Sequence, residues 1–196
     1  APYNTRYHGD RDIGFADVVN GVGGVFHTSS VMARSSLFRE LPDYCVVSEK
    51  HGVGDHPRAI LFALSGKIRY IDRYMSVYRN NSTPTAWTTR MRENAFLVDR
   101  LTGAVEMYAA ALGHVEGENK KLLEQTLHRY EWELLQAKGE YAEMRREPYR
   151  MITKQRGLIP MLWLDFKQSL PGLYCLYMRA RGMEKGIPEK LRKGKR

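Results

Sequence analysis

The polar segment N-N-S-T-P at residues 80–84 divides this 196-residue chain into two parts that differ in apolar patterning. After it, apolar residues recur at spacings of three and four, which is typical of a helix that buries one face. The pattern predicts one long helix over 89–112 and a second from residue 119 onward. Gly139 lies inside the second run and weakens a helix. The turn of a helical hairpin is therefore predicted over 134–144, with a continuous helix as the alternative.

The part before residue 80 carries shorter and more varied elements. Residues 56–64 have Pro57 in the first turn and Gly66 after the end, which predicts a helix. Residues 25–32 follow a glycine-rich turn and are rich in β-branched and aromatic side chains, which predicts a strand. The full set of predictions is helices over 13–19, 35–41 and 56–64, and strands over 25–32, 67–72 and 74–79. The first part is therefore expected to be α/β.

Positive charge is concentrated at the C-terminal end. The chain has 31 Lys and Arg against 22 Asp and Glu, and residues 179–196 alone hold 8 basic and 2 acidic side chains. A basic tail without a zinc-finger spacing or an RNA-binding strand motif argues against specific nucleic-acid binding. Cys45 and Cys175 are too far apart in the sequence to indicate a disulfide framework or a metal cluster, which fits a reducing compartment. A cytoplasmic location is therefore expected.

Residues 149–178 combine apolar and aromatic side chains with flanking Lys and Arg. This composition suits a helix that lies in a membrane interface, with the basic tail on anionic lipid. It equally suits a cap on a helical core with a solvated tail. The most apolar window, residues 157–178, is interrupted by Pro160, Asp165 and Lys167, so no membrane-spanning helix is expected. Peripheral attachment to the inner membrane is left open.

Four motifs follow one another between His27 and Trp87. They are H-T-S-S-V-M-A-R, then G-D-H-P, then S-G-K-I-R-Y-I-D-R-Y-M-S-V-Y-R, and last S-T-P-T-A-W. In this order and spacing they resemble the C-terminal half of the catalytic domain of family-2 glycosyltransferases, inverting enzymes of the GT-A fold that build bacterial polysaccharides and lipid-linked glycans. The resemblance covers residues 13–90. It implies the acceptor-side half of a GT-A fold over 1–88, a helical extension over 89–178 and a basic tail over 179–196.

The resemblance gives a role to Asp55 in the G-D-H-P motif. Inverting transfer requires a carboxylate on the acceptor side, which removes the proton of the acceptor hydroxyl as that oxygen attacks the anomeric carbon. Asp55 occupies the acidic position of the family, and a helix start would keep its carboxylate ionised and oriented. From residue type alone, an aspartate at a helix start is equally a capping residue without chemistry. The sequence leaves both interpretations open.

Further site residues come from the same resemblance. Arg79 is expected to stabilise charge on the departing diphosphate, or to form an ordinary salt bridge. Trp87 is expected to stack on a sugar, or to anchor its loop. The residues expected to border the acceptor and donor sites are Thr28, Ser29, Ser30, Arg34 and His56. Their alternative roles are local hydrogen bonds to the backbone and, for His56, core packing.

The metal ion of the family belongs to the half that the resemblance does not cover. In relatives, an Asp-x-Asp motif after an apolar strand holds Mg²⁺ or Mn²⁺ against the diphosphate of the nucleotide sugar. Asp10 and Asp12 match this motif literally, but residues 3–9 before them are polar. We therefore expect the Mg²⁺ or Mn²⁺ ligands, and most contacts to the nucleotide-sugar donor, to lie outside this chain.

Protein interaction is the alternative class of function. Residues 125–146 faintly resemble a tetratricopeptide helix pair. One pair cannot bury its own apolar face, and no second copy follows at a fixed period, so a repeat array is not predicted. The alternative to a transferase is therefore a helical interaction module without catalysis, in which Asp55 has no chemical role.

Overall fold

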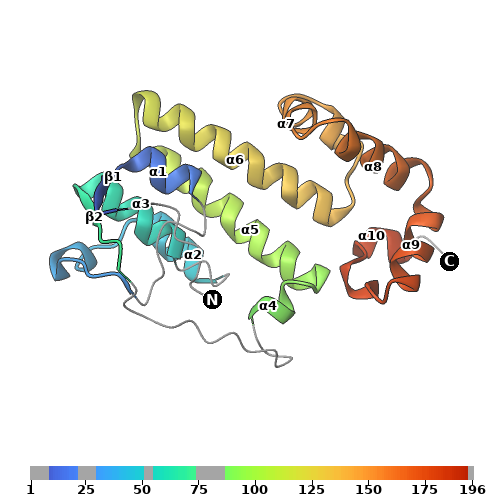
Figure 1. The fold of residues 1–196 in the computed structure, drawn as a ribbon, viewed down its shortest axis with the longest axis horizontal. Coiled ribbons are helices and arrows are strands. Elements are labelled where there is room, and N and C mark those ends of the chain that lie inside the picture. Colours follow the sequence, from blue (N-terminus) through green and yellow to red (C-terminus); the bar gives the residue numbers. More distant parts are fainter. Residues whose placement is uncertain (1–8, 22–29, 51–54, 74–86, 194–196) are drawn as a thin grey trace. The chain divides into compact units, whose positions relative to one another are not determined.

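The structure is a computed structural model that describes residues 9–21, 30–50, 55–73 and 87–193 (Figure 1). The chain divides into two compact units. The first unit consists of residues 1–80 and 106–126, and the second of residues 81–105 and 127–196. The described residues are mostly helical, and the sheet they contain has two strands.

The first unit is built around two packed helices and a small sheet. Its elements are β1 (Arg11–Ile13), α1 (Phe15–Asn20), η2 (Ser35–Phe38), α2 (Asp43–Lys50), α3 (Asp55–Ser65) and β2 (Ile68–Tyr70). The strands pair antiparallel, and Ile13 is buried against Ile68 and Tyr70. α1 packs on α3, because each helix presents a buried apolar stripe. These stripes consist of Phe15, Val18 and Val19 on α1, and Pro57, Ala59, Ile60 and Leu61 on α3.

Two long helices form an antiparallel hairpin that contributes residues to both units. They are α5 (Asn94–Ala111) and α6 (Gly117–Lys138), joined through η3 (Leu112–His114). The side chain of Asn94 is buried, and its Nδ2 donates a hydrogen bond of 2.8 Å to the carbonyl oxygen of Ala137. The last carbonyls of a helix have no partner within the helix. This bond therefore satisfies one of them and ties the start of α5 to the end of α6.

The second unit adds shorter helices to this hairpin. They are α4 (Trp87–Arg90), η4 (Glu143–Arg145), α7 (Tyr149–Gln155), α8 (Leu158–Ser169), α9 (Pro171–Ala180), η5 (Glu184–Gly186) and α10 (Glu189–Lys193). One apolar cluster consists of Trp132, Tyr141, Met144 and Leu164, and another of Tyr174, Cys175, Met178 and Ile187. Among the residues that the structure describes, no helix combines the length and the apolar character needed to cross a membrane.

The predicted fold class is wrong. Half of a GT-A fold would contain a parallel sheet covered by helices on both faces. The described residues instead form helices and one antiparallel pair of three-residue strands. The alternation predicted over 67–72 does give β2, but among the described residues this short strand pairs with β1 alone, and α1 and α3 pack on each other. Residues 30–34 form no strand, and residues 25–29 and 74–79 lie outside the described residues.

Several helix predictions are confirmed. The helix predicted over 56–64 is α3, and those predicted over 89–112 and from 119 onward are α5 and α6, with ends shifted by a few residues. α6 ends at Lys138, and Gly139 follows with a φ of +76°, so the predicted turn lies there. The helices predicted over 13–19 and 35–41 are present as the shorter α1 and η2.

Gly139 should tolerate substitution less well than Gly182. Their φ angles are +76° and +67°, so alanine at either position carries similar left-handed strain of about 1–2 kcal/mol. A Cβ on Gly139 would also lie 3.1 Å from Cβ of Pro188, whereas a Cβ on Gly182 would meet nothing within 4 Å. In urea denaturation, Gly139→Ala is therefore expected to lower the unfolding free energy more than Gly182→Ala does. Equal losses would show that the approach to Pro188 is unimportant.

Candidate functional site

Asp55 lies at the start of α3 with its side chain exposed. The helix that carries it is fixed in the first unit, because Pro57 in the first turn and Ile60 in the next are buried. A negative charge in the first turn is stabilised by the helix dipole. The carboxylate is therefore held on an anchored element while it remains open to solvent.

Asp55 differs from the other described aspartates in its lack of an internal partner. The aspartates that have one are Asp10, Asp12, Asp17, Asp43, Asp72, Asp99 and Asp165. Within the described parts of the chain, Asp55 makes no hydrogen bond or ion pair. Such a carboxylate can accept a proton from a bound molecule without first breaking an internal bond.

His56 follows Asp55 but is half-buried. The centre of its ring lies 6.5 Å from the ring centre of Tyr108 in α5, with the ring planes tilted by 51°. Tyr108 is buried in the core of the first unit. This contact favours the packing interpretation of His56 over a direct contact with an acceptor.

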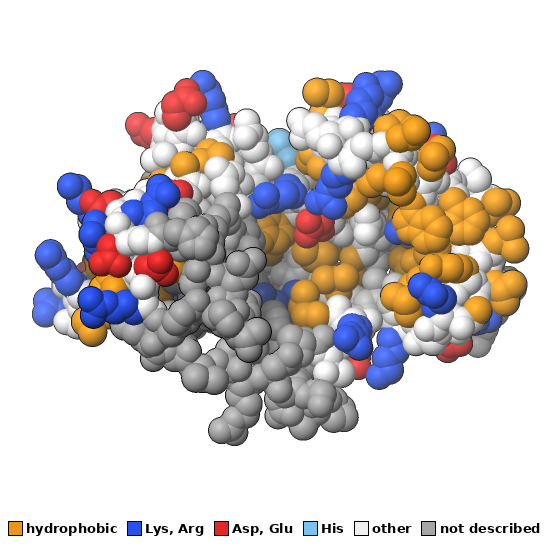
Figure 2. Space-filling view, in the orientation of Figure 1, with side chains coloured by type: hydrophobic (Ala, Val, Ile, Leu, Met, Phe, Trp, Pro, Cys, Tyr) orange, Lys and Arg blue, Asp and Glu red, His pale blue; other side chains and the backbone are white. Residues whose placement is uncertain are grey.

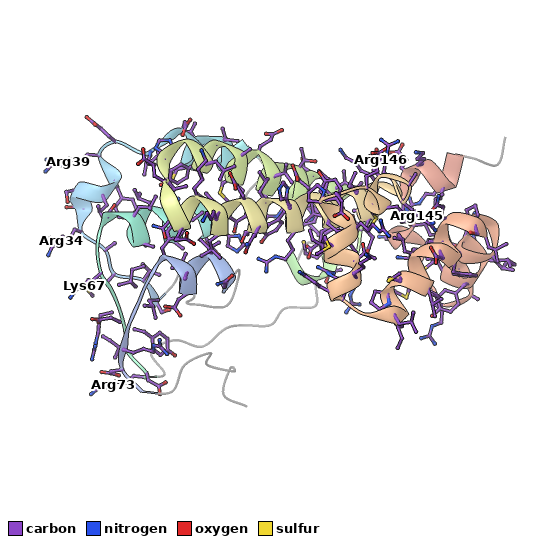
Figure 3. All side chains as sticks on the ribbon, turned by 90° about the horizontal axis from the view of Figure 1, so that it is seen from above. Arg34, Arg39, Lys67, Arg73, Arg145 and Arg146 are labelled. Carbon is purple, nitrogen blue, oxygen red and sulfur yellow. The ribbon has the colours of Figure 1, made fainter. Side chains whose placement is uncertain are left out.

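The structure describes some of the other predicted site residues. Ser30 and Arg34 are exposed, and Arg34 projects outward from the first unit (Figure 3). No hydrogen bond or ion pair joins Arg34 to Asp55, both of which are described. Trp87 begins α4, but its side chain lies outside the described part of the structure. The remaining residues outside it are Thr28, Ser29 and Arg79.

Asp10 and Asp12 do not fit a divalent-cation site. Oδ1 of Asp10 accepts a hydrogen bond of 2.9 Å from the backbone N–H of Asp72, and Asp12 forms a 3.1 Å ion pair with Arg69. Both contacts hold the two strands together, and the guanidinium beside Asp12 repels a cation. Over the described ranges, no group of three or more His, Cys, Asp and Glu side chains could hold a metal ion.

The first unit also contains a paired carboxylate that sequence patterns did not indicate. Nε2 of His114 donates a hydrogen bond of 2.7 Å to Oδ1 of Asp43, and the N–H of Tyr44 donates one of 2.8 Å to the same oxygen. The bond from His114 and then the backbone bond hold the pKa of Asp43 below its ordinary value. The buried ring of Tyr44 packs edge-on against the ring of His114, with ring centres 5.1 Å apart. The pair therefore joins α2 to η3 rather than presenting a free base.

Lys167 in α8 is a buried cation that sequence analysis also missed. Its side chain is buried, and Nζ lies 5.5–5.9 Å from the ring centres of Tyr141, Trp163 and Tyr174. Burial lowers the pKa of Lys167, while the ring faces stabilise its charged form by cation–π attraction. The residue lines a cavity of about 410 Å³ together with residues 139–143, Gln168, Pro171, Lys190 and Leu191. The sequence signal that could have revealed this residue is a lysine inside an otherwise apolar helix face.

Comparisons with protein families, with curated proteins and with solved structures find no match to this chain. Function is therefore inferred from the residues themselves and from the motif resemblance. Among the predicted site residues whose side chains are described, Asp55 has the surroundings that suit a chemical role.

Lys167 should make the stability of the chain depend on pH. Because burial lowers its pKa, the unfolded chain holds this proton more tightly than the folded chain does. The unfolding free energy of the wild type should therefore rise relative to that of Lys167→Met as the pH increases toward 10.5, the ordinary value for lysine, and should level off above it. Urea denaturation of both proteins across this pH range measures the difference. A difference that stays constant with pH would contradict the assignment.

Proposed function

We propose that this chain takes part in the transfer of a sugar, with inversion, from a nucleotide sugar to a polysaccharide or lipid-linked acceptor, and that Asp55 is the general base. The motifs between His27 and Trp87 support this reaction class through their resemblance to family-2 glycosyltransferases. The observation that carries the proposal is the state of Asp55. It is exposed at the start of an anchored helix and has no partner among the described residues.

In the proposed step, Asp55 moves one proton. Its carboxylate accepts the proton of the acceptor hydroxyl while the hydroxyl oxygen bonds to the anomeric carbon from the face opposite the leaving group. The bond between the anomeric carbon and the diphosphate oxygen breaks, and the nucleoside diphosphate leaves with the electron pair. Because Asp55 is exposed, it can return the proton to solvent afterwards.

Other roles in the proposal rest on the resemblance alone. Arg79 would bind oxygens of the leaving diphosphate through its forked guanidinium, and Trp87 would stack on a sugar ring. Most contacts to the donor, and the Mg²⁺ or Mn²⁺ ligands, would come from protein outside the described residues. The residues that would border the acceptor are Thr28, Ser29, Ser30 and Arg34.

The proposal includes a cytoplasmic location with peripheral attachment to the inner membrane. Cys45 and Cys175 are both buried free thiols. Free thiols are typical of a reducing compartment, which supports a location on the cytoplasmic side of the membrane.

Asp55→Asn tests the proposed base. Asparagine is as well suited to a helix start as aspartate, but it cannot take up the proton. We expect acceptor-dependent release of nucleoside diphosphate to fall by about 10²- to 10⁴-fold. Binding of the nucleotide sugar should stay unchanged. The assay uses the intact protein in membranes of producing cells, with UDP-, GDP- and dTDP-linked sugars as donors.

Asp43→Asn is the matched control. It makes the same substitution at the first residue of another helix, α2, in the same unit. Transfer by this variant should stay near the wild-type rate. If Asp55→Asn also transfers sugar at the wild-type rate, Asp55 has no chemical role, and the helical interaction module becomes the better proposal. Equal losses in both variants would likewise contradict a specific role for Asp55.

A further inference from the structure

α8 presents apolar side chains to solvent along one side. Leu158, Ile159 and Leu162 are 68%, 81% and 58% exposed, and helical geometry places them on the same side. The buried residues Leu164 and Lys167 lie on the opposite side. Packing within the second unit therefore uses one side of α8 and leaves an apolar side uncovered.

α9 repeats this arrangement, because it is apolar on two sides. Tyr174, Cys175 and Met178 form its buried stripe. Leu173, Leu176 and Tyr177 stand at spacings of three and four and form a second, exposed stripe. A helix that is apolar on all sides is normally buried all round. The exposed stripe of α9 is therefore suited to a second contact.

Trp163 of α8 connects the exposed apolar side of α8 with the exposed stripe of α9. Its ring stacks on Phe166 of the same helix, with ring centres 5.2 Å apart, and meets the rings of Tyr174 and Tyr177 of α9 edge-on at 6.2 Å and 5.6 Å. Figure 2 shows hydrophobic side chains gathered over the region where Figure 1 places α8 and α9. We call this surface the apolar face; it consists of Leu158, Ile159, Leu162, Trp163, Leu173 and Leu176.

The part of the sequence that contains the apolar face has a predominantly positive charge. Residues 149–196 hold 12 of the 31 Lys and Arg residues but 3 of the 22 Asp and Glu residues, so they carry the whole formal net charge of +9. Within it, Asp165 pairs with Arg145 and Glu184 lies 3.9 Å from Arg179, while Arg156 and Lys185 pair with Glu133 and Glu93. The Arg181 guanidinium lies 5.9 Å from the ring centre of Tyr177, which places a cation at the margin of the exposed stripe of α9.

We propose that the apolar face inserts into the interfacial layer of a membrane rich in anionic lipid. Leucine and tryptophan side chains enter the boundary between headgroups and acyl chains, while the surrounding cations bind lipid phosphates. A second copy of the chain is a poorer occupant, because it would bring a region of the same positive charge against this one. This inference does not rest on the proposed sugar transfer.

Sedimentation of the full chain with lipid vesicles tests the proposal. We expect the wild type to bind vesicles that contain phosphatidylglycerol more strongly than vesicles of phosphatidylcholine alone, with binding weakened by salt. The double variant Leu162→Glu and Leu176→Glu should bind the anionic vesicles at least about tenfold more weakly. The matched control is Met32→Glu with Val46→Glu, which adds the same charge at exposed apolar positions of the first unit and should bind like the wild type.

Tryptophan quenching gives a second measurement that does not depend on charged variants. In a chain that carries Trp87→Phe, brominated lipid should quench the fluorescence, and a further Trp163→Phe should remove most of that quenching, because Trp132 is buried in the unit. The proposal is overturned if the wild type does not bind anionic vesicles, or if the double variant binds them as well as the control. It is also overturned if the double variant abolishes self-association or capture of a protein partner while vesicle binding is unchanged.

Discussion

The antiparallel pairing of α5 and α6 is the constraint on which both units depend. Each helix gives part of its length to each core, with Met107 and Leu123 buried in the first unit and Leu101 and Trp132 in the second. The bond from Asn94 to the carbonyl at the end of α6 closes this hairpin inside the second unit. The chain turns directly afterwards, at Gly139 with its φ of +76°.

The residues of the proposed chemistry and of the proposed membrane attachment lie in different units. Asp55 belongs to the first unit, where a short helix is anchored by its buried side and its start is left in water. The apolar face belongs to the second, where two helices bury one side each and expose the other. Charge follows the same division, because the first unit holds 12 basic and 12 acidic side chains and the second holds 19 and 10. A substitution can therefore affect one proposed function and leave the other intact.

Local patterns predicted the helices well, because an apolar stripe, a first-turn proline or a glycine after the end acts within a few residues. α3, α5, α6 and the turn at Gly139 follow from such signals. The sheet could not be predicted in the same way, since alternation over 67–72 does not say which segment pairs with it, and the partner, residues 11–13, has one buried apolar side chain. The GT-A fold was predicted wrongly because the sequence does not show which strands pair.

Whether a site could be predicted also depends on how far apart its residues lie in the sequence. Asp55 stands in a motif of four neighbouring residues and was found from sequence. The pair of Asp43 and His114 joins residues 71 positions apart, so no local pattern reveals it. The apolar stretch of 149–178 was recognised, but the sequence could not say which of its side chains the unit would bury. The structure separates the exposed apolar side chains of α8 and α9 from the buried ones.

The anomeric configuration of the product is the most direct test of an inverting transfer with one general base. Proton NMR of the glycosylated acceptor, formed from a donor of known configuration, measures it. The expected product has the configuration opposite to that of the donor, because in the proposed step the hydroxyl activated by Asp55 attacks from the face opposite the diphosphate. A product with the configuration of the donor would contradict it, because retention requires a second displacement at the same carbon.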